Sequence, residues 1–157
     1  MLIIRIGAMK LHTIDIEVPC SASPEVTFDI LQDAAGWKTW SAASKSYLEL
    51  DGSPTPDGVG AIRRFGTGPF KSKEEVVAYE RPTHFAYILH KGIPVKDYRA
   101  DVVINPSGTG CTITWHSTFH RKYPLTGTST RLFLKYFLRD TARRLARAAE
   151  AQTRPTA

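Results

Sequence analysis

The last part of the chain, residues 128–150, constrains the fold most because it predicts one long amphipathic helix. It contains no Gly or Pro and is rich in Leu, Ala, Arg and Lys, which lose little side-chain entropy in a helix. Leu132, Phe133 and Tyr136 widen the apolar surface of its first half. An inner stripe recurs at helical spacing and consists of Leu134, Phe137, Leu138, Thr141, Ala142, Leu145 and Ala149. Such a helix requires a concave apolar partner that covers the stripe.

The preceding chain predicts an antiparallel sheet that can supply this partner. A helix with Ser23 as its N-cap and Pro24 at its first position follows the first strand, and a second short helical segment spans residues 37–43. The predicted strands cover residues 10–18, 45–50, 59–65, 70–79, 84–90, 96–104 and 111–120, with turn residues between neighbours. The order indicates an α+β fold, in which a curved six- to seven-stranded antiparallel sheet wraps around the long C-terminal helix.

The length of 157 residues suits a single domain, which we place at residues 9–151. Residues 1–8 are predicted to be an N-terminal extension, or to precede an alternative start at Met9, and residues 152–157 to be a flexible tail. The first residues lack the basic start and long apolar core of a signal peptide, so a cytoplasmic location is expected. Cys20 and Cys111 have no metal-binding or redox spacing, which favours two reduced thiols, although a disulfide stays open.

Four stretches of the sequence occur in an order that is familiar from one superfamily. They are residues 18–26 (VPCSASPEV), 33–40 (DAAGWKTW) and 58–64 (GVGAIRR), and residues 97–100 (DYRA) together with 112–115 (TITW). In this order they resemble the helix-grip fold of the START and birch-pollen-allergen type, also called SRPBCC. The nearest branch is its bacterial polyketide cyclase/dehydrase and lipid-transport group. The resemblance predicts the fold rather than the activity, because this fold hosts cyclases, hydratases, lipid carriers, chaperone activators and toxins.

The resemblance implies a mostly apolar cavity between the sheet and the long helix. We therefore expect a small hydrophobic ligand, either lipid-like or aromatic and polyketide-like, to bind there. Aromatic side chains on the strands and the helix are candidates to line the cavity, although such rings also simply fill protein cores. The candidates are Trp40, Phe65, Phe70, Tyr79, Phe85, Tyr87, Tyr98, Trp115, Phe119, Phe133 and Phe137. The hydroxyl of Tyr98 could orient a polar end of the ligand.

Arg63 and Arg64 are neighbours on one predicted strand, so a regular strand turns one of them inward. A buried guanidinium requires an anionic partner. Glu74 or Glu75 on the next strand could supply it, and the functional alternative is an acidic head group of the ligand. Both arginines are therefore candidate ligand-binding residues.

No catalytic residue can be assigned from the sequence. The five histidines are scattered and have no metal-ligand spacing. Phosphate-binding and nucleophile motifs are missing from the sequence as well. We therefore expect no metal and no cofactor. A cyclase/aromatase or dehydratase is the enzymatic alternative to ligand binding, and it would need polar groups inside the cavity that the sequence does not identify.

Basic residues form a second feature of the long helix. Arg131, Lys135, Arg139, Arg143 and Arg147 repeat every four residues opposite the inner stripe. They form either a solvated face or an interaction surface, which is the third functional hypothesis. An anionic membrane surface suits this face as a transient partner. Nucleic acid is disfavoured, because no aromatic residues interleave with the basic ones and no recognition motif occurs, whereas a homodimer stays open.

Overall fold

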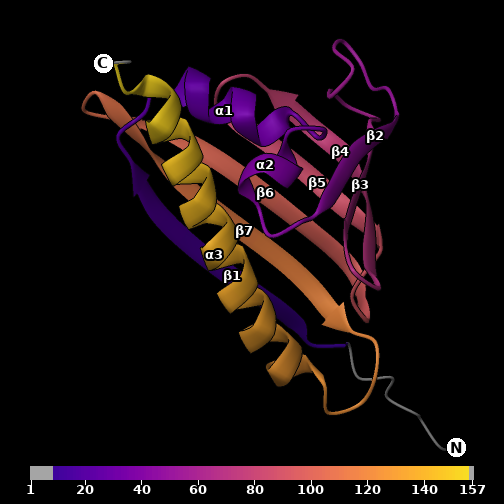
Figure 1. Ribbon diagram of the computed structural model, residues 1–157. Coiled ribbons are helices and arrows are strands. Elements are labelled where there is room, and N and C mark those ends of the chain that lie inside the picture. Colours follow the sequence, from indigo (N-terminus) through magenta and orange to yellow (C-terminus); the bar gives the residue numbers. More distant parts are fainter. Residues whose placement is uncertain (1–8, 156–157) are drawn as a thin grey trace, which may run out of the picture.

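The fold is a curved antiparallel sheet with one long helix on its concave face (Figure 1). The computed structural model describes residues 9–155, so the predicted extension at residues 1–8 lies outside the described part. The strands follow the order β1-β7-β6-β5-β4-β3-β2, and each strand is antiparallel to its neighbours. This is the α+β helix-grip architecture that the sequence predicts.

The predicted strands are all present, with differences at their ends. The strands are β1 (Leu11–Cys20), β2 (Lys45–Leu50), β3 (Ile62–Thr67), β4 (Phe70–Glu80), β5 (His84–Lys91), β6 (Val95–Ser107) and β7 (Gly110–Arg121). β3 begins at Ile62 rather than at residue 59, because Val59 forms only an isolated bridge with Ser53. Gly60 then turns the chain at a φ of +88°, which glycine adopts easily.

The helices are α1 (Pro24–Gln32), α2 (Trp37–Trp40) and α3 (Gly127–Thr153). Ser23 caps α1 as predicted, because its Oγ accepts a hydrogen bond of 3.3 Å from the backbone N–H of Val26. α2 is a single turn, shorter than the predicted segment of residues 37–43. α3 extends beyond residue 150, so the start of the predicted tail at residues 152–157 is helical. None of the described helices is long and apolar enough to cross a membrane.

Strand alternation gives the sheet one apolar face. Along β1, every second residue is buried and the intervening ones are exposed. The register with β7 places Ile16 opposite Trp115 and Val18 opposite Ile113, and all four side chains belong to the core. The two cysteines meet at the end of the same pair of strands, where Cys20 lies opposite Cys111, and both are buried free thiols.

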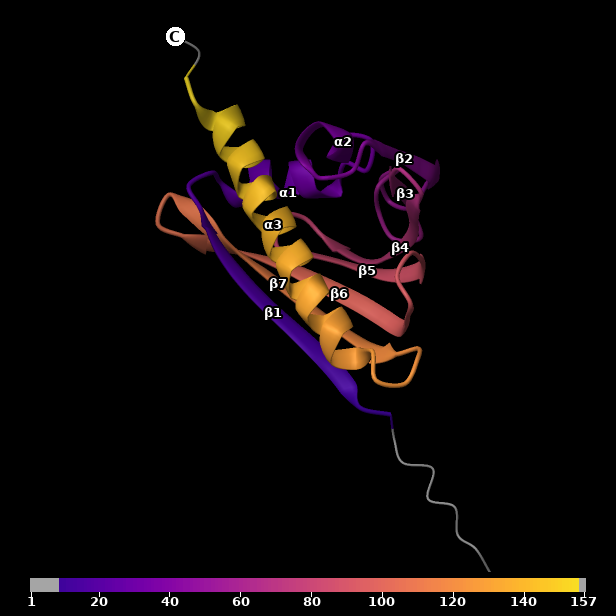
Figure 2. The ribbon, with the colours of Figure 1, turned by 60° about the horizontal axis from the view of Figure 1, so that its bottom comes forward.

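α3 runs along β1 and β7 on the concave side of the sheet (Figure 2). Its buried residues are Gly127, Ala146 and those of the predicted inner stripe except Phe137, which is partly exposed. Gly127 begins the helix so close to β1 that a methyl group at this position would collide with the His12 ring. The start of α3 is therefore fixed against β1. The first half of α3 lies along the β1 side and leaves the neighbouring part of the concave face uncovered.

We predict that Leu145→Ala destabilises the protein far more than Leu132→Ala. Leu145 is fully buried in the core, whereas Leu132 on the same helix is 58% exposed. The core substitution should lower the free energy of unfolding by about 2–5 kcal/mol. The surface substitution should change it by no more than about 0.5 kcal/mol. Urea denaturation followed by circular dichroism measures both, and equal losses would contradict the packing described here.

Candidate ligand-binding cavity

A cavity of about 410 Å³ lies between the first half of α3 and the concave face of the sheet. Strands β3 to β7 each contribute side chains to it, and the segment around α2 closes one side. Phe70, Phe133 and Phe137 line the cavity but are 77%, 57% and 42% exposed, so they form its rim. The cavity therefore opens at the end of the sheet where α3 begins.

Seven of the eleven sequence-predicted aromatic residues come together at this cavity. Phe65, Tyr87, Tyr98 and Trp115 reach it from four different strands, and Phe133 and Phe137 reach it from α3. Strand alternation explains this convergence, since each of these strand residues points to the concave face. Phe70, at the start of β4, also lines the cavity.

Three predicted aromatic residues lie in the core away from the cavity. Phe85 and Phe119 are fully buried, and the Phe119 ring stacks on His12 at a centroid distance of 5.1 Å. Tyr79 packs edge-to-face on Phe28 beneath α1, at 5.3 Å, and its hydroxyl donates to the side-chain oxygen of Gln32. Tyr79 and Phe85 pack beneath α1, and Phe119 packs beside His12 where α3 begins, so these rings do not line the opening.

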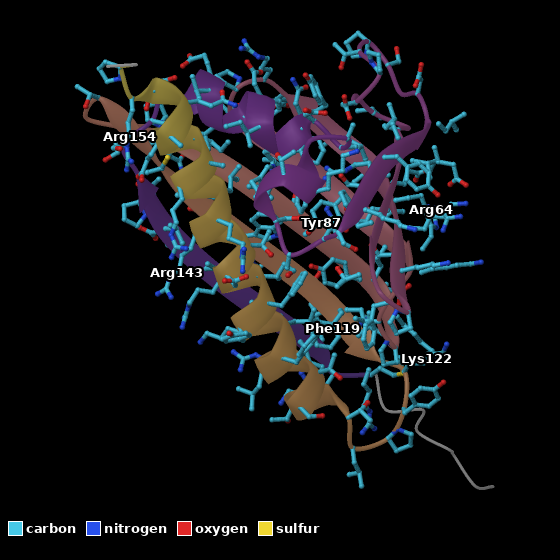
Figure 3. All side chains as sticks on the ribbon, in the orientation of Figure 1. Arg64, Tyr87, Phe119, Lys122, Arg143 and Arg154 are labelled. Atoms are coloured by element: carbon cyan, nitrogen blue, oxygen red, sulfur yellow. The ribbon has the colours of Figure 1, made fainter. Side chains whose placement is uncertain are left out.

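Trp40 and Arg64 also lie away from the cavity. The Trp40 ring packs against Trp37 at 4.6 Å, and it is Trp37 that lines the cavity. Arg64 points outward from the sheet, whereas Tyr87 lies between α3 and β3 (Figure 3). Arg64 Nε donates to Glu49 Oε2 at 3.0 Å in an exposed ion pair.

Arg63 is the inward arginine of the pair, and it is fully buried. It does not line the cavity but lies behind the cavity wall. Its Cζ is 4.7 Å from the centre of the Trp37 ring and 4.9 Å from that of Phe65. The rings of Phe85 and Tyr87 lie within 5.0 and 6.0 Å. Aromatic faces attract a cation electrostatically, so this ring cluster offsets part of the cost of burying the guanidinium.

The Arg63 guanidinium nevertheless lacks conventional partners. None of its three side-chain nitrogens has a hydrogen-bond partner among the described residues. Burial lowers the pKa of Arg63, and the carboxylate of Glu74 is the strongest opposing influence. An arginine side chain stays protonated in proteins even so. The cation therefore depends on electrostatic compensation from its surroundings.

Glu74 is the polar group that the sequence did not place in the cavity. It lies opposite Arg63 in the β3–β4 register and lines the cavity from β4. Its Oε2 is buried and has no hydrogen-bond partner among the described residues. Burial raises the pKa of Glu74 to about 7, against the lowering effect of the nearby Arg63 charge. Near neutral pH this carboxyl group can therefore either accept or donate a proton.

Two tyrosines add hydroxyl groups to the same wall. The Tyr98 hydroxyl donates to Ser117 Oγ at 3.4 Å, and burial raises the pKa of Tyr98 to about 12. Burial likewise raises the pKa of Tyr87 above its usual value. Both phenols therefore stay neutral at physiological pH and can serve as hydrogen-bond donors. The cavity combines a mostly apolar lining with the Glu74 carboxyl group, the two phenols and a few other polar side chains, among them Ser72 and Thr141.

Several residues that line the cavity were not predicted from the sequence. The sequence patterns that could have identified them differ. Glu74 could have been found from strand alternation, because Ser72, Glu74 and Val76 share one face of β4. Trp37 is three residues before Trp40, and in the structure Trp37 Nε1 donates a hydrogen bond of 2.8 Å to the Leu31 carbonyl. No sequence pattern distinguishes these two rings.

Comparison with known families identifies the class of protein. The sequence matches the profile of the polyketide cyclase / dehydrase and lipid transport family over residues 12–150. The chain belongs to this family. The match spans the strands, the helices and the whole cavity, so the family assignment applies to the domain and not to a local motif. No curated protein matches the sequence.

Solved structures with the same fold have low sequence identity. A START superfamily protein from Mycobacterium smegmatis has a TM-score of 0.78 at 16% identity, covering 90% of this chain and 99% of that one. Norcoclaurine synthase from Thalictrum flavum, in complex with dopamine and hydroxybenzaldehyde, has a TM-score of 0.71 at 16% identity and covers 99% of both chains. At this identity the likeness shows the fold alone.

We predict that Glu74 makes the stability of the protein depend on pH between about 4.5 and 7. Its pKa is higher in the folded protein than in the unfolded chain, so the folded state holds more protons in this window. The contribution of this group to the free energy of unfolding is fully present below about pH 4.5. It is lost as the pH rises through 7, which lowers the free energy of unfolding by on the order of 3 kcal/mol. Glu74→Gln should flatten this dependence.

The measurement is the free energy of unfolding against pH, together with an NMR titration of the Glu74 carboxyl group. Glu75→Gln is the control, because Glu75 is the next residue on β4 and does not line the cavity. If both variants changed the pH profile equally, the special environment of Glu74 would be disproved.

Proposed function

We propose that this protein binds a small apolar ligand, aromatic or lipid-like, between the sheet and α3. The observation that carries the proposal is an apolar cavity of about 410 Å³ that is lined by aromatic rings from five strands and from α3. This volume falls within the range of about 300–1,000 Å³ that is usual for small-molecule sites. Membership of a family described by polyketide chemistry and lipid transport supports the same class of ligand.

Glu74 supplies the polar contact that would orient the ligand. Ligand-binding cavities are typically apolar with a few polar groups that fix orientation. Because its pKa is about 7, the carboxyl group can accept a hydrogen bond from a hydroxyl or donate one to a carbonyl oxygen. Arg63 already places a positive charge behind the wall, so an ammonium group here would add a second buried cation. A neutral ligand with hydroxyl or carbonyl oxygens therefore fits best.

We predict that Phe137→Ala weakens ligand uptake while Tyr136→Ala does not. Both residues are exposed aromatics on the same turn of α3, but only Phe137 lines the cavity. Loss of part of a buried ring contact should weaken binding by about three- to tenfold. Titration of a fluorescent apolar dye, and its displacement by aromatic ketones or fatty acids, measures the effect in solution. Absence of dye uptake by the wild-type protein would refute the proposal.

A second candidate function is catalysis of a cyclisation or dehydration on a polyketide-like substrate. The observation that favours it is Glu74, a cavity carboxyl group with a pKa near neutrality, next to the hydroxyls of Tyr87 and Tyr98. A general base is most effective when its pKa is close to the operating pH. The carboxylate could remove a proton from a carbon between two carbonyl groups and return it to a departing hydroxyl.

If this second function is correct, Glu74→Gln should lower turnover of a poly-β-ketone by about 100-fold or more while the ligand still binds. Product analysis by mass spectrometry gives the rate, and dye displacement gives the affinity. Tyr98→Phe is the comparison, because it removes a hydroxyl group and leaves the carboxyl group in place. Turnover that is unchanged in Glu74→Gln would leave ligand binding as the function.

A further inference from the structure

Several large apolar side chains are exposed at the end of the molecule where the cavity opens. Leu125 is 93% exposed and Tyr136 is 76% exposed. We use the term apolar rim for Phe70, Leu125, Leu132, Phe133, Tyr136 and Phe137, all of which are more than one third exposed. They come from the β3–β4 turn, the β7–α3 loop and the first turns of α3, which lie at the same end of the molecule (Figures 1 and 2). Groups of large exposed apolar side chains at one end of a protein often mark an interaction site.

The backbone at Leu125 is a second, independent observation. Leu125 has a φ of +63°, in the left-handed region that non-glycine residues rarely adopt. A leucine at this position is strained, and its side chain packs on almost nothing. Neither folding nor solubility favours an exposed leucine at a position suited to Gly or Asn. The Leu125 side chain is therefore free to contact a partner outside the molecule.

The charges around the apolar rim are almost entirely positive. Lys71 follows the β3–β4 turn, Lys122 lies in the β7–α3 loop, and Lys135 and Arg139 lie on the first half of α3. Lys91 and Lys96 flank the β5–β6 turn, whose Gly92 and Ile93 also line the cavity. The only acidic residue in the described segments 67–72, 90–97 and 119–139 is Asp97. Farther along α3, the outward positions are basic instead of apolar, with Arg143 and Arg147 exposed. Apolar tips surrounded by basic side chains are typical of surfaces that insert shallowly into a lipid interface.

We propose that the apolar rim docks on the surface of a lipid bilayer that contains anionic lipids. The apolar side chains would enter the interface, and the surrounding lysines would contact the acidic head groups. A second copy of the chain is a poorer occupant, because face-to-face contact would bring two sets of like charges together. Nucleic acid offers no environment for the aliphatic side chains of Leu125 and Leu132.

Docking in this orientation would place the cavity mouth against the membrane. Phe70, Phe133 and Phe137 belong both to the apolar rim and to the cavity lining. A ligand could therefore pass between the bilayer and the cavity without crossing water. This route rests on the proposed ligand binding, whereas docking itself does not depend on it.

Vesicle sedimentation with the full chain tests the proposal. We expect the protein to bind phosphatidylcholine vesicles that contain phosphatidylglycerol. Binding should be weaker to pure phosphatidylcholine vesicles, and weaker to the mixed vesicles at high salt concentration. The double variant Leu125→Asn with Tyr136→Gln should lower the affinity by about tenfold, because two inserted side chains are lost. Asn tolerates positive φ, so this variant should be no less stable than the wild type.

The matched control is Leu50→Asn with Tyr47→Gln, the same two changes at exposed positions of the edge strand β2. It should leave vesicle binding unchanged. Dye titration without vesicles should give the same affinity for the Leu125 variant as for the wild type, since neither Leu125 nor Tyr136 lines the cavity. The proposal is overturned if the wild type does not bind anionic vesicles or if both double variants lose binding equally. Dimerisation that depends on Leu125, without vesicle binding, would also overturn it and assign the surface to a second copy.

Discussion

One helix is too narrow to cover a seven-stranded sheet, and this mismatch underlies the whole architecture. Seven strands spaced about 4.8 Å apart span roughly 30 Å, whereas a helix with its side chains is about 10 Å wide. α3 covers the side of β1 and β7, and α1 covers one end of the sheet. The cavity is the remaining part of the apolar face, where no helix packs on the strands. The site therefore follows from the proportions of the fold, and its chemistry from the few polar residues that face the gap.

The buried charges beside this gap are unfavourable for stability. Arg63 and Glu74 are brought opposite each other by the strand register, yet within residues 9–155 the Arg63 nitrogens and Glu74 Oε2 have no hydrogen-bond partner. Hydrophobic residues at both positions would fill the same space without the desolvation cost. Departures of this kind from good packing are expected at functional sites. The aromatic rings around Arg63 make the arrangement tolerable, and they also separate the guanidinium from the ligand space.

The sequence predicted the fold well and the site in part, and the difference has a physical reason. Period-two alternation along β1 and β7, and the inner stripe of α3, fix which residues face the core. Alternation alone cannot say whether an inward ring meets another element or an open space. Phe85 and Tyr87 face inward from the same strand, but only Tyr87 reaches the cavity, because α1 covers Phe85. Likewise, only the three-dimensional structure shows that Glu74 Oε2 is buried without a hydrogen-bond partner in the described part of the chain.

The pairing of the first strand with the last has a consequence for synthesis on the ribosome. Leu11 lies opposite His120, and α3 then packs on β1, so the core joins segments from both ends of the described chain. Contacts of such long sequence separation form late and slow the folding of a domain. The apolar face of the sheet stays uncovered until α3 has left the exit tunnel, and during this interval the nascent chain is most exposed to aggregation. The folding step that closes the core is therefore also the step that creates the cavity.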